Sequence, residues 1–111
     1  MIEAVCDCGA VRIELAVPPD EVSECQCSFC QKKGVLWSYY PVRAVRVEAA
    51  DDATFPYLRG PGLSEFHTCK GCGCTTHWRP TDDRSFMGVN ARLMPREVRD
   101  AARYVIDPGP G

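Results

Sequence analysis

The eight cysteines of this 111-residue chain constrain its fold more than any other feature. They form three clusters, within which neighbouring cysteines are separated by one or two residues: Cys6 and Cys8; Cys25, Cys27 and Cys30; Cys69, Cys72 and Cys74. Ligand pairs with this spacing let one turn supply two corners of a tetrahedral zinc site. The clusters are far apart in the chain, so they can meet only through tertiary structure. The pattern predicts a domain built around metal.

A secreted, disulfide-bonded scaffold is the alternative explanation for so many cysteines. Residues 1–5 contain neither a basic run nor a long apolar core, so we predict no signal peptide. No apolar run approaches the roughly 20 residues that a membrane span needs. We therefore expect a cytoplasmic protein, in which thiols stay reduced and clustered cysteines favour metal over disulfides.

Length and charge limit the remaining possibilities. A chain of this length is expected to form one zinc-binding domain, residues 1–111, and a domain so small gains from a structural metal. The formal net charge of −2 provides no basic surface for nucleic acid. Seven thiolates holding two zinc ions would move the charge to about −5. We therefore expect no nucleic-acid partner.

The chain between the clusters is typical of short strands and turns. Segments that alternate apolar and polar residues, or that are rich in β-branched and aromatic residues, are predicted as strands: 11–17, 34–40, 44–48, 57–58, 63–68, 75–78 and 85–92. Asp51, Asp52 and Pro56 indicate a loop. The one good helix candidate is 95–103, and the tail, 107–111, is predicted to be frayed. The fold class is therefore mainly β, with antiparallel sheets and little helix.

The outer clusters can form one complete metal site. Cys6 and Cys8 together with Cys69 and Cys72 supply four thiolates, which is the full coordination of a structural zinc. Such a site would join segments that are more than 60 residues apart. We predict a structural role for it because no position remains for a substrate.

The central cluster then has three cysteines of its own. Cys25, Cys27 and Cys30 with one open position would match the ligand pattern of a catalytic zinc. Cys74 is the remaining cysteine, and two arrangements stay open. If Cys74 fills the fourth position, the second site is closed and purely structural; if it does not, the site can bind an incoming ligand.

The clusters and their flanking residues also resemble a known family. The matching motifs are CDCG at 6–9, CQCSFC at 25–30, Phe66 followed by CKGCG at 69–73, and VNAR at 89–92. Together they are similar to the glutathione-dependent formaldehyde-activating enzyme family, whose superfamily includes centromere protein V. The similarity covers most of the chain, from Cys6 to Arg92.

The resemblance implies a β-tent fold, stapled by two zinc ions. It implies that Cys6, Cys8, Cys69 and Cys72 hold a structural zinc and that Cys25, Cys27 and Cys30 hold a catalytic zinc. It further implies a carbon–sulfur lyase acting on a small thiol, such as glutathione, and an aldehyde, such as formaldehyde. A zinc with an open position can bind a thiol and lower its pKa, which makes a usable nucleophile. Lys32 and Lys33 follow the ligands and could hold a substrate carboxylate.

Other chemically capable residues receive simpler interpretations. We expect His67 and His77 to pack or to lie on the surface, because thiols already suffice as ligands. Trp37, Tyr39 and Tyr40 could line a pocket, but aromatic residues of strands more often belong to the core, and we expect them there. Asn90 and Arg92 belong to the family motif, but their spacing on one strand face is also compatible with a structural role.

Two other functions fit the same cysteines. The chain could be a non-enzymatic interaction domain stapled by zinc, in which the central cluster only stabilises the fold. It could also be a redox or metal-buffering protein that uses Cys74 as a reactive thiol. Binding of a thiol beside the central cluster separates the interaction domain from the lyase. Protection of Cys74 from alkylation in the metal-loaded protein would argue against the redox or metal-buffering function.

Overall fold

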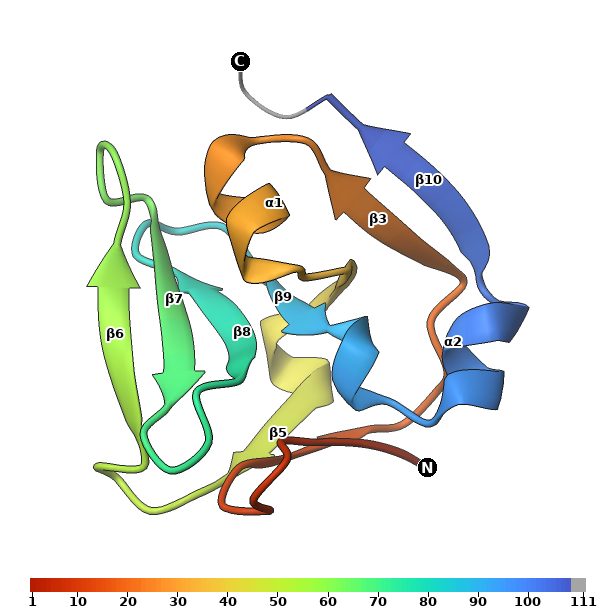
Figure 1. The fold of residues 1–111 in the computed structure, drawn as a ribbon, viewed down its shortest axis with the longest axis horizontal. Coiled ribbons are helices and arrows are strands. Elements are labelled where there is room, and N and C mark those ends of the chain that lie inside the picture. The colour runs from red at the N-terminus through yellow and green to blue at the C-terminus, as the bar shows by residue number, and fades with distance from the viewer. Residues whose placement is uncertain (109–111) are drawn as a thin grey trace.

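The computed structural model describes residues 1–108 as two β-sheets with short helices between their strands (Figure 1). The smaller sheet has three antiparallel strands in the order β1 (Ile2–Val5), β2 (Arg12–Leu15) and β5 (Val45–Glu48). No helix of the described part has the length and apolarity that crossing a membrane requires.

The larger sheet has seven strands. Their order is β10 (Arg103–Asp107), β3 (Glu21–Cys25), β4 (Trp37–Pro41), β9 (Phe86–Asn90), β8 (Thr75–Pro80), β7 (Ser64–Cys69) and β6 (Thr54–Leu58). Neighbouring strands are antiparallel except β10 and β3, which run parallel. The prediction of a mainly β domain is confirmed, with one parallel pair as a departure from its antiparallel pattern.

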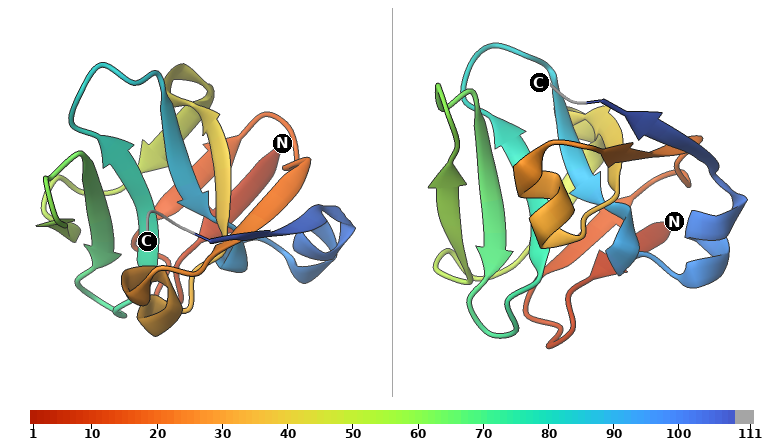
Figure 2. Two further views of the ribbon diagram at one scale, coloured as in Figure 1. Left: turned by 90° about the horizontal axis from the view of Figure 1, so that it is seen from above. Right: turned by 45° about the horizontal axis from the view of Figure 1, so that its top comes forward.

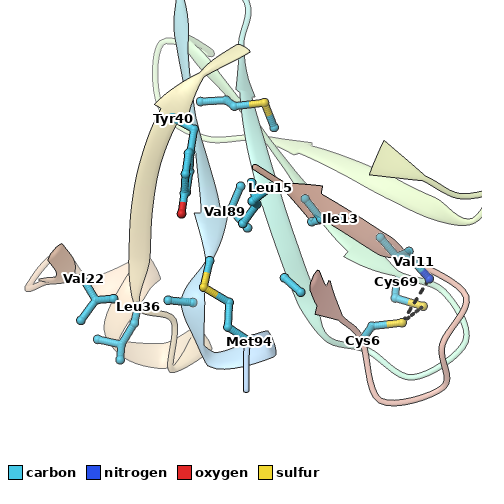
Figure 3. Close-up of a cluster of buried hydrophobic side chains, with 13 residues drawn as sticks. Cys6, Val11, Ile13, Leu15, Val22, Leu36, Tyr40, Cys69, Val89 and Met94 are labelled. Carbon is cyan, nitrogen blue, oxygen red and sulfur yellow. Dashed lines mark hydrogen bonds between the residues drawn. The ribbon is translucent and has the colours of Figure 1, made fainter. Parts of the chain in front are cut away.

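The main core lies between the two sheets, as Figure 3 shows. On β2 the inward-facing Ile13 and Leu15 are fully buried, whereas Arg12 is exposed, which is the alternation that the sequence indicates. Val89 of β9 and Tyr40 of β4 belong to the same cluster. Burying each large aliphatic side chain contributes about 1.5–3 kcal/mol, so this layer fixes how the two sheets pack together.

Two α-helices and two 3₁₀ turns connect the strands. Helix α2 (Arg96–Ala101) confirms the predicted helix, although it ends earlier because β10 begins at Arg103. The turns are η1 (Val42–Ala44) and η2 (Ala91–Leu93). Helix α1 (Ser28–Lys33) was not predicted; the central cluster was interpreted as a turn, but its last half is helical.

Several other expectations need correction. Strands β1, β3 and β10 were not predicted, and β6 passes through Pro56, which was assigned to a loop. Strand β6 is at the edge of its sheet, where a missing N–H group is tolerated. Asp107 was placed in a frayed tail but is the last residue of β10, paired with Cys25. Pro108 follows without regular secondary structure, and the rest of that predicted tail, 109–111, lies outside the described residues.

Candidate metal sites and the adjoining cavity

The structure brings the outer cysteine clusters together. The sulfur atoms of Cys6, Cys8, Cys69 and Cys72 all lie within 4.8 Å of one another. Cys6 Sγ is 3.8 Å from Cys8 Sγ and 3.7 Å from Cys69 Sγ, and Cys8 Sγ is 3.6 Å from Cys69 Sγ. Figure 3 shows Cys6 and Cys69 at the end of the main core, next to Val11.

These distances fit a tetrahedral metal–thiolate site. Two sulfur atoms that each lie about 2.3 Å from one zinc ion are about 3.8 Å apart. Backbone groups also point at the sulfurs: the Val11 N–H donates to Cys6 Sγ at 3.3 Å. Backbone N–H groups of Cys74 and Cys8 lower the pKa of Cys72 to about 6. The four residues can therefore hold a metal ion, and their donor set is compatible with zinc.

Close backbone packing supports this first site. A Cβ atom at Gly71, in the turn between β7 and β8, would lie only 2.9 Å from Cys8 Sγ, so a larger residue there would displace that sulfur or the turn. Cys69 closes β7 and is fully buried, while Cys8 is exposed at the surface. The site thus joins the turn after β1 to the end of β7, and so links the two sheets.

The central cluster forms a second group, in which Cys25, Cys27 and Cys30 have their sulfur atoms within 4.8 Å of one another. Cys25 ends β3, Cys27 is the N-cap of α1, and Cys30 lies inside that helix. The Cys27 sulfur accepts the Cys30 backbone N–H at 3.4 Å, so the cap positions the thiol. At the other end of α1, Gly34 adopts the left-handed conformation that ends the helix.

Hydrogen bonds hold this group against the strands. The Trp37 indole donates to Cys30 Sγ at 3.3 Å, and the Gln31 side-chain amide donates to the Cys25 carbonyl at 3.2 Å. Burial raises the pKa of Cys30 to about 12 and also raises that of Cys25. The pKa of Cys27 is lowered despite its partial burial, because the Cys30 N–H, the adjacent thiols and Arg59 stabilise its thiolate.

Cys74 belongs to neither of the two cysteine groups that could hold a metal ion among residues 1–108. Its thiol lies beside Cys72, where the two sulfur groups interact, and its carbonyl accepts the Cys69 N–H at 2.8 Å. Of the two arrangements that the sequence left open, the structure therefore favours a Cys74 that lies next to the first group and does not complete the second.

The central cluster faces a cavity of about 620 Å³. Four aromatic residues line it: Trp37, Tyr39, Phe66 and Trp78. Its charged lining residues are two arginines, Arg59 and Arg84, and one aspartate, Asp107. Helix α1 lies beside strands β6 to β8 at this end of the larger sheet (Figure 1 and Figure 2). The arrangement can admit a small molecule to the three sulfur atoms.

The arginines were not singled out from the sequence. Arg59 Nη1 donates to Cys27 Sγ at 3.5 Å, and its Nη2 donates to Ser28 Oγ at 3.2 Å. Arg84 stacks over the Trp78 ring at 5.3 Å and pairs with Asp82. Both lie in connections between strands, so only the folded sheet reveals their position.

The sequence does contain one signal for α1 that was missed. A glycine at position 34, directly after Lys32 and Lys33, is typical of the end of a helix.

Trp37, Tyr39 and Tyr40 were all expected in the core. Trp37 and Tyr40 are buried, but Trp37 also lines the cavity. Tyr39 lines the cavity as well and is 42% exposed, so its assignment to the core was wrong.

Neither histidine joins a cysteine group in the described chain. His67 and His77 stack on each other with centroids 4.5 Å apart, and their Nδ1 atoms hydrogen-bond to Thr54 and Thr76. The predicted packing role is confirmed for His77, which is buried.

Asn90 has a structural role. Its side-chain oxygen accepts the backbone N–H groups of Leu36 and Arg92, and its amide donates to the Thr75 carbonyl.

Comparison with known proteins agrees with this geometry. The fold is similar to the crystal structure of a Rhodobacter sphaeroides protein, with a TM-score of 0.75 and 24% identity, over 93% of this chain and 99% of that one. A comparison with curated proteins found no match. The family model of the glutathione-dependent formaldehyde-activating enzyme matches residues 1–105. The chain therefore belongs to the glutathione-dependent formaldehyde-activating enzyme family, which implies an enzyme acting on small molecules.

Proposed function

We propose that the protein is a zinc-dependent carbon–sulfur lyase that forms or cleaves the adduct of a small thiol with an aldehyde. Glutathione and formaldehyde are the proposed substrates because the family description names them. The observation that carries the proposal is the group of three sulfur atoms that faces a cavity. Within residues 1–108 this group includes no fourth cysteine, histidine, aspartate or glutamate.

The two cysteine groups have different roles in this proposal. Cys6, Cys8, Cys69 and Cys72 hold a structural zinc, and Cys25, Cys27 and Cys30 hold the second zinc. When bound there, the second ion supplies a positive charge and a coordination position that favour the thiolate form of the substrate. A cytoplasmic location, where thiols are reduced, suits both sets of ligands.

The chemical step balances without an added oxidant or reductant. The thiol releases its proton to water, the sulfur forms a bond to the aldehyde carbon, and the electron pair of the C=O π bond moves to oxygen. The oxygen then accepts a proton from water, which gives the S-hydroxymethyl adduct. In the reverse direction the carbon–sulfur bond breaks and the same protons return.

Residues of the cavity stabilise the negative charge that develops on the aldehyde oxygen and exclude water. Desolvation raises the pKa of the Tyr39 hydroxyl to about 12, so this group remains protonated at neutral pH. We assign to Tyr39 Oη the hydrogen bond to the aldehyde oxygen as negative charge develops on it. The rings of Trp37, Phe66 and Trp78 restrict water around the reacting atoms.

The proposal is tested by following exchange between free formaldehyde and its glutathione adduct by NMR. The zinc-loaded wild-type protein should accelerate exchange. Cys30→Ser should abolish the acceleration, and Cys74→Ser should retain it. A wild-type protein that leaves the uncatalysed exchange rate unchanged would overturn the assignment and favour a structural role for the central cluster.

A further inference from the structure

Strand β10 forms one edge of the larger sheet. It ends the strand order, so among residues 1–108 no strand pairs with its outer side. Figure 1 shows it at the border of the molecule, beyond β3. An edge strand presents a row of backbone N–H and C=O groups to which another extended segment can add, and native edges usually carry a feature that prevents this.

Other edges in the molecule have such a feature, and β10 does not. Strand β6, at the opposite edge of the same sheet, contains Pro56, which has no N–H group to donate. Strand β5, at one edge of the smaller sheet, alternates the exposed Arg46 and Glu48 with its apolar residues. Strand β10 contains no proline, and its charged residues, Arg103 and Asp107, lie only at its two ends. It is therefore the less protected edge of the larger sheet.

The pairing with β3 determines which backbone groups of β10 point outward. The Arg103 N–H donates to the Asp20 carbonyl at 2.9 Å, and the Asp107 carbonyl accepts the Gln26 N–H at 2.8 Å. Backbone groups of successive residues in a strand point to opposite sides, so residues two apart bond to the same neighbour. The odd-numbered residues of β10 therefore bond to β3, and the even-numbered residues direct their N–H and C=O groups away from it.

Tyr104 and Ile106 are these two even-numbered residues. Their side chains lie on one face of the sheet, because they are two positions apart. Tyr104 is 52% exposed and Ile106 is 64% exposed, which is high for large apolar residues of a strand. A strand added at this edge would therefore gain backbone hydrogen bonds and apolar contact at the same two residues.

The sequence of β10, RYVID, is complementary to itself when two copies run antiparallel. With the Val105 residues of both copies opposite each other, Tyr104 faces Ile106 and Arg103 faces Asp107 of the other copy. Tyr104 and Ile106 then form hydrogen-bonded pairs, in which the two residues exchange both of their bonds. The opposite charges fall at non-hydrogen-bonded positions, where side chains of neighbouring strands lie closest.

Other registers satisfy fewer of these groups. A shift by one residue would place the outward-pointing groups of one copy opposite residues that bond to β3 in the other. A shift by two residues would restore the hydrogen-bonding pattern but would lose both pairs of opposite charge and shorten the overlap. The register centred on Val105 is thus the one that uses the whole strand.

We propose that β10 pairs antiparallel with β10 of a second copy of this chain and joins the two larger sheets edge to edge. The pairing has a two-fold axis at Val105, so it covers the outer edge of both copies and ends at a dimer. Asp107 also lines the cavity that the central cysteines face, so the pairing brings Arg103 of the second copy beside a residue of that cavity. The inference does not depend on the lyase proposal.

Ile106→Pro tests the pairing in the metal-loaded full chain. Proline removes an N–H group that points outward and leaves the bonds to β3 in place. The matched control is Ile106→Thr, which also removes apolar contact but keeps the N–H group and a β-branched side chain. Analytical ultracentrifugation over a concentration series gives the dimer Kd of each protein, and circular dichroism checks that each is folded.

Wild type should form a dimer of two 12.3-kDa chains. Ile106→Pro should raise the dimer Kd at least about tenfold, because each copy loses a donor and leaves a carbonyl of its partner without a hydrogen bond. Ile106→Thr should raise it by less than about threefold. A wild type that stays monomeric up to about 1 mM, or equal Kd values for the two variants, would overturn the inference.

Amide hydrogen exchange of wild type provides a second test that needs no substitution and decides the matter if the proline variant does not fold. The Val105 N–H points to β3 in monomer and dimer, so it should exchange slowly at every concentration. The N–H groups of Tyr104 and Ile106 should exchange at least about tenfold more slowly in the dimer than after dilution to monomer. Exchange at these two residues that is independent of concentration would show that β10 is not the interface.

Discussion

The guanidinium group of Arg59 lies against the sulfur of Cys27, with Nη1 3.5 Å from Sγ. The two residues are 32 positions apart in the chain, and the contact connects the loop after β6 to the N-cap of α1. The Cys30 N–H, the neighbouring thiols and this contact together lower the pKa of Cys27, whereas burial raises the pKa of Cys25 and Cys30. Cys27 is therefore the member of the central cluster that is most favoured as a thiolate.

Arg59→Met should make Cys27 less reactive at neutral pH. Methionine keeps an extended side chain but removes the positive charge that, with the Cys30 N–H and the neighbouring thiols, lowers the pKa of Cys27. The pH dependence of iodoacetamide labelling, measured on zinc-depleted protein by mass spectrometry of the Cys27 peptide, should therefore move to higher pH. Arg84→Met is the control, since Arg84 lines the same cavity and pairs with Asp82. Equal labelling profiles for wild type and Arg59→Met would contradict the contact.

Cys69→Ser should destabilise the protein, whereas Cys74→Ser should have little effect, although the two cysteines lie in one cluster of the sequence. Cys69 belongs to the first sulfur group, where a bound metal would join the two sheets, and structural zinc contributes directly to folding. We expect its loss to lower the melting temperature by more than about 10 °C. Cys74→Ser should keep both metal ions and nearly the wild-type melting temperature. Elemental analysis and thermal unfolding check both, and loss of an ion from Cys74→Ser would show that Cys74 is a ligand.

Gly88→Ala should destabilise the cavity wall. A Cβ atom at Gly88 of β9 would overlap the indole ring of Trp78, which crosses that position from β8. We expect a cost of about 1–3 kcal/mol in the free energy of unfolding, which denaturant titration measures. In a Trp78→Leu background the alanine should cost much less, because the overlapping ring is gone. Equal costs in the two backgrounds would place the strain elsewhere.

His77 should make stability depend on pH in the acidic range. Burial, with smaller effects from His67 and Arg79, lowers its pKa to about 3, whereas the unfolded value is about 6.5. Between pH 3 and pH 6.5 the unfolded chain therefore binds more protons than the folded protein. The contribution of His77 to the free energy of unfolding is complete above about pH 6.5 and is lost as pH falls towards 3.

The slope from this one group approaches about 1.4 kcal/mol per pH unit between the two pKa values. His77→Gln removes the titrating group and should therefore show a shallower decline than wild type. Urea unfolding between pH 4 and 7 compares the two proteins, and the thiols that titrate in both are common to the comparison. Identical slopes would show that His77 does not stay neutral in the folded state.

Sequence reasoning succeeded where a local pattern determines the structure. The alternation of Arg12, Ile13 and Leu15 predicts β2, and the cysteine spacing predicts the two groups whose sulfur atoms the fold brings together. For β2 and for the central cysteines the signal lies within a few residues, and for the outer cysteines it lies in the short spacing within each pair.

Features that depend on distant contacts were not predictable in the same way. Strand β10 exists through its parallel pairing with β3, which starts about 80 residues earlier. Arg59 reaches Cys27 only because the sheet places β6 beside α1. Helix α1 is six residues long and rich in cysteine, so hydrophobic periodicity cannot indicate it.

The central claim is that Cys25, Cys27 and Cys30 hold a zinc ion that can also bind the substrate thiol. X-ray absorption spectroscopy of the two-zinc protein tests it most directly, because it counts sulfur ligands. One four-sulfur site and one three-sulfur site average to about 3.5 sulfurs per zinc, and this number should rise to about 4 when glutathione is added. An average of 4 before addition, or no change after it, would contradict the account.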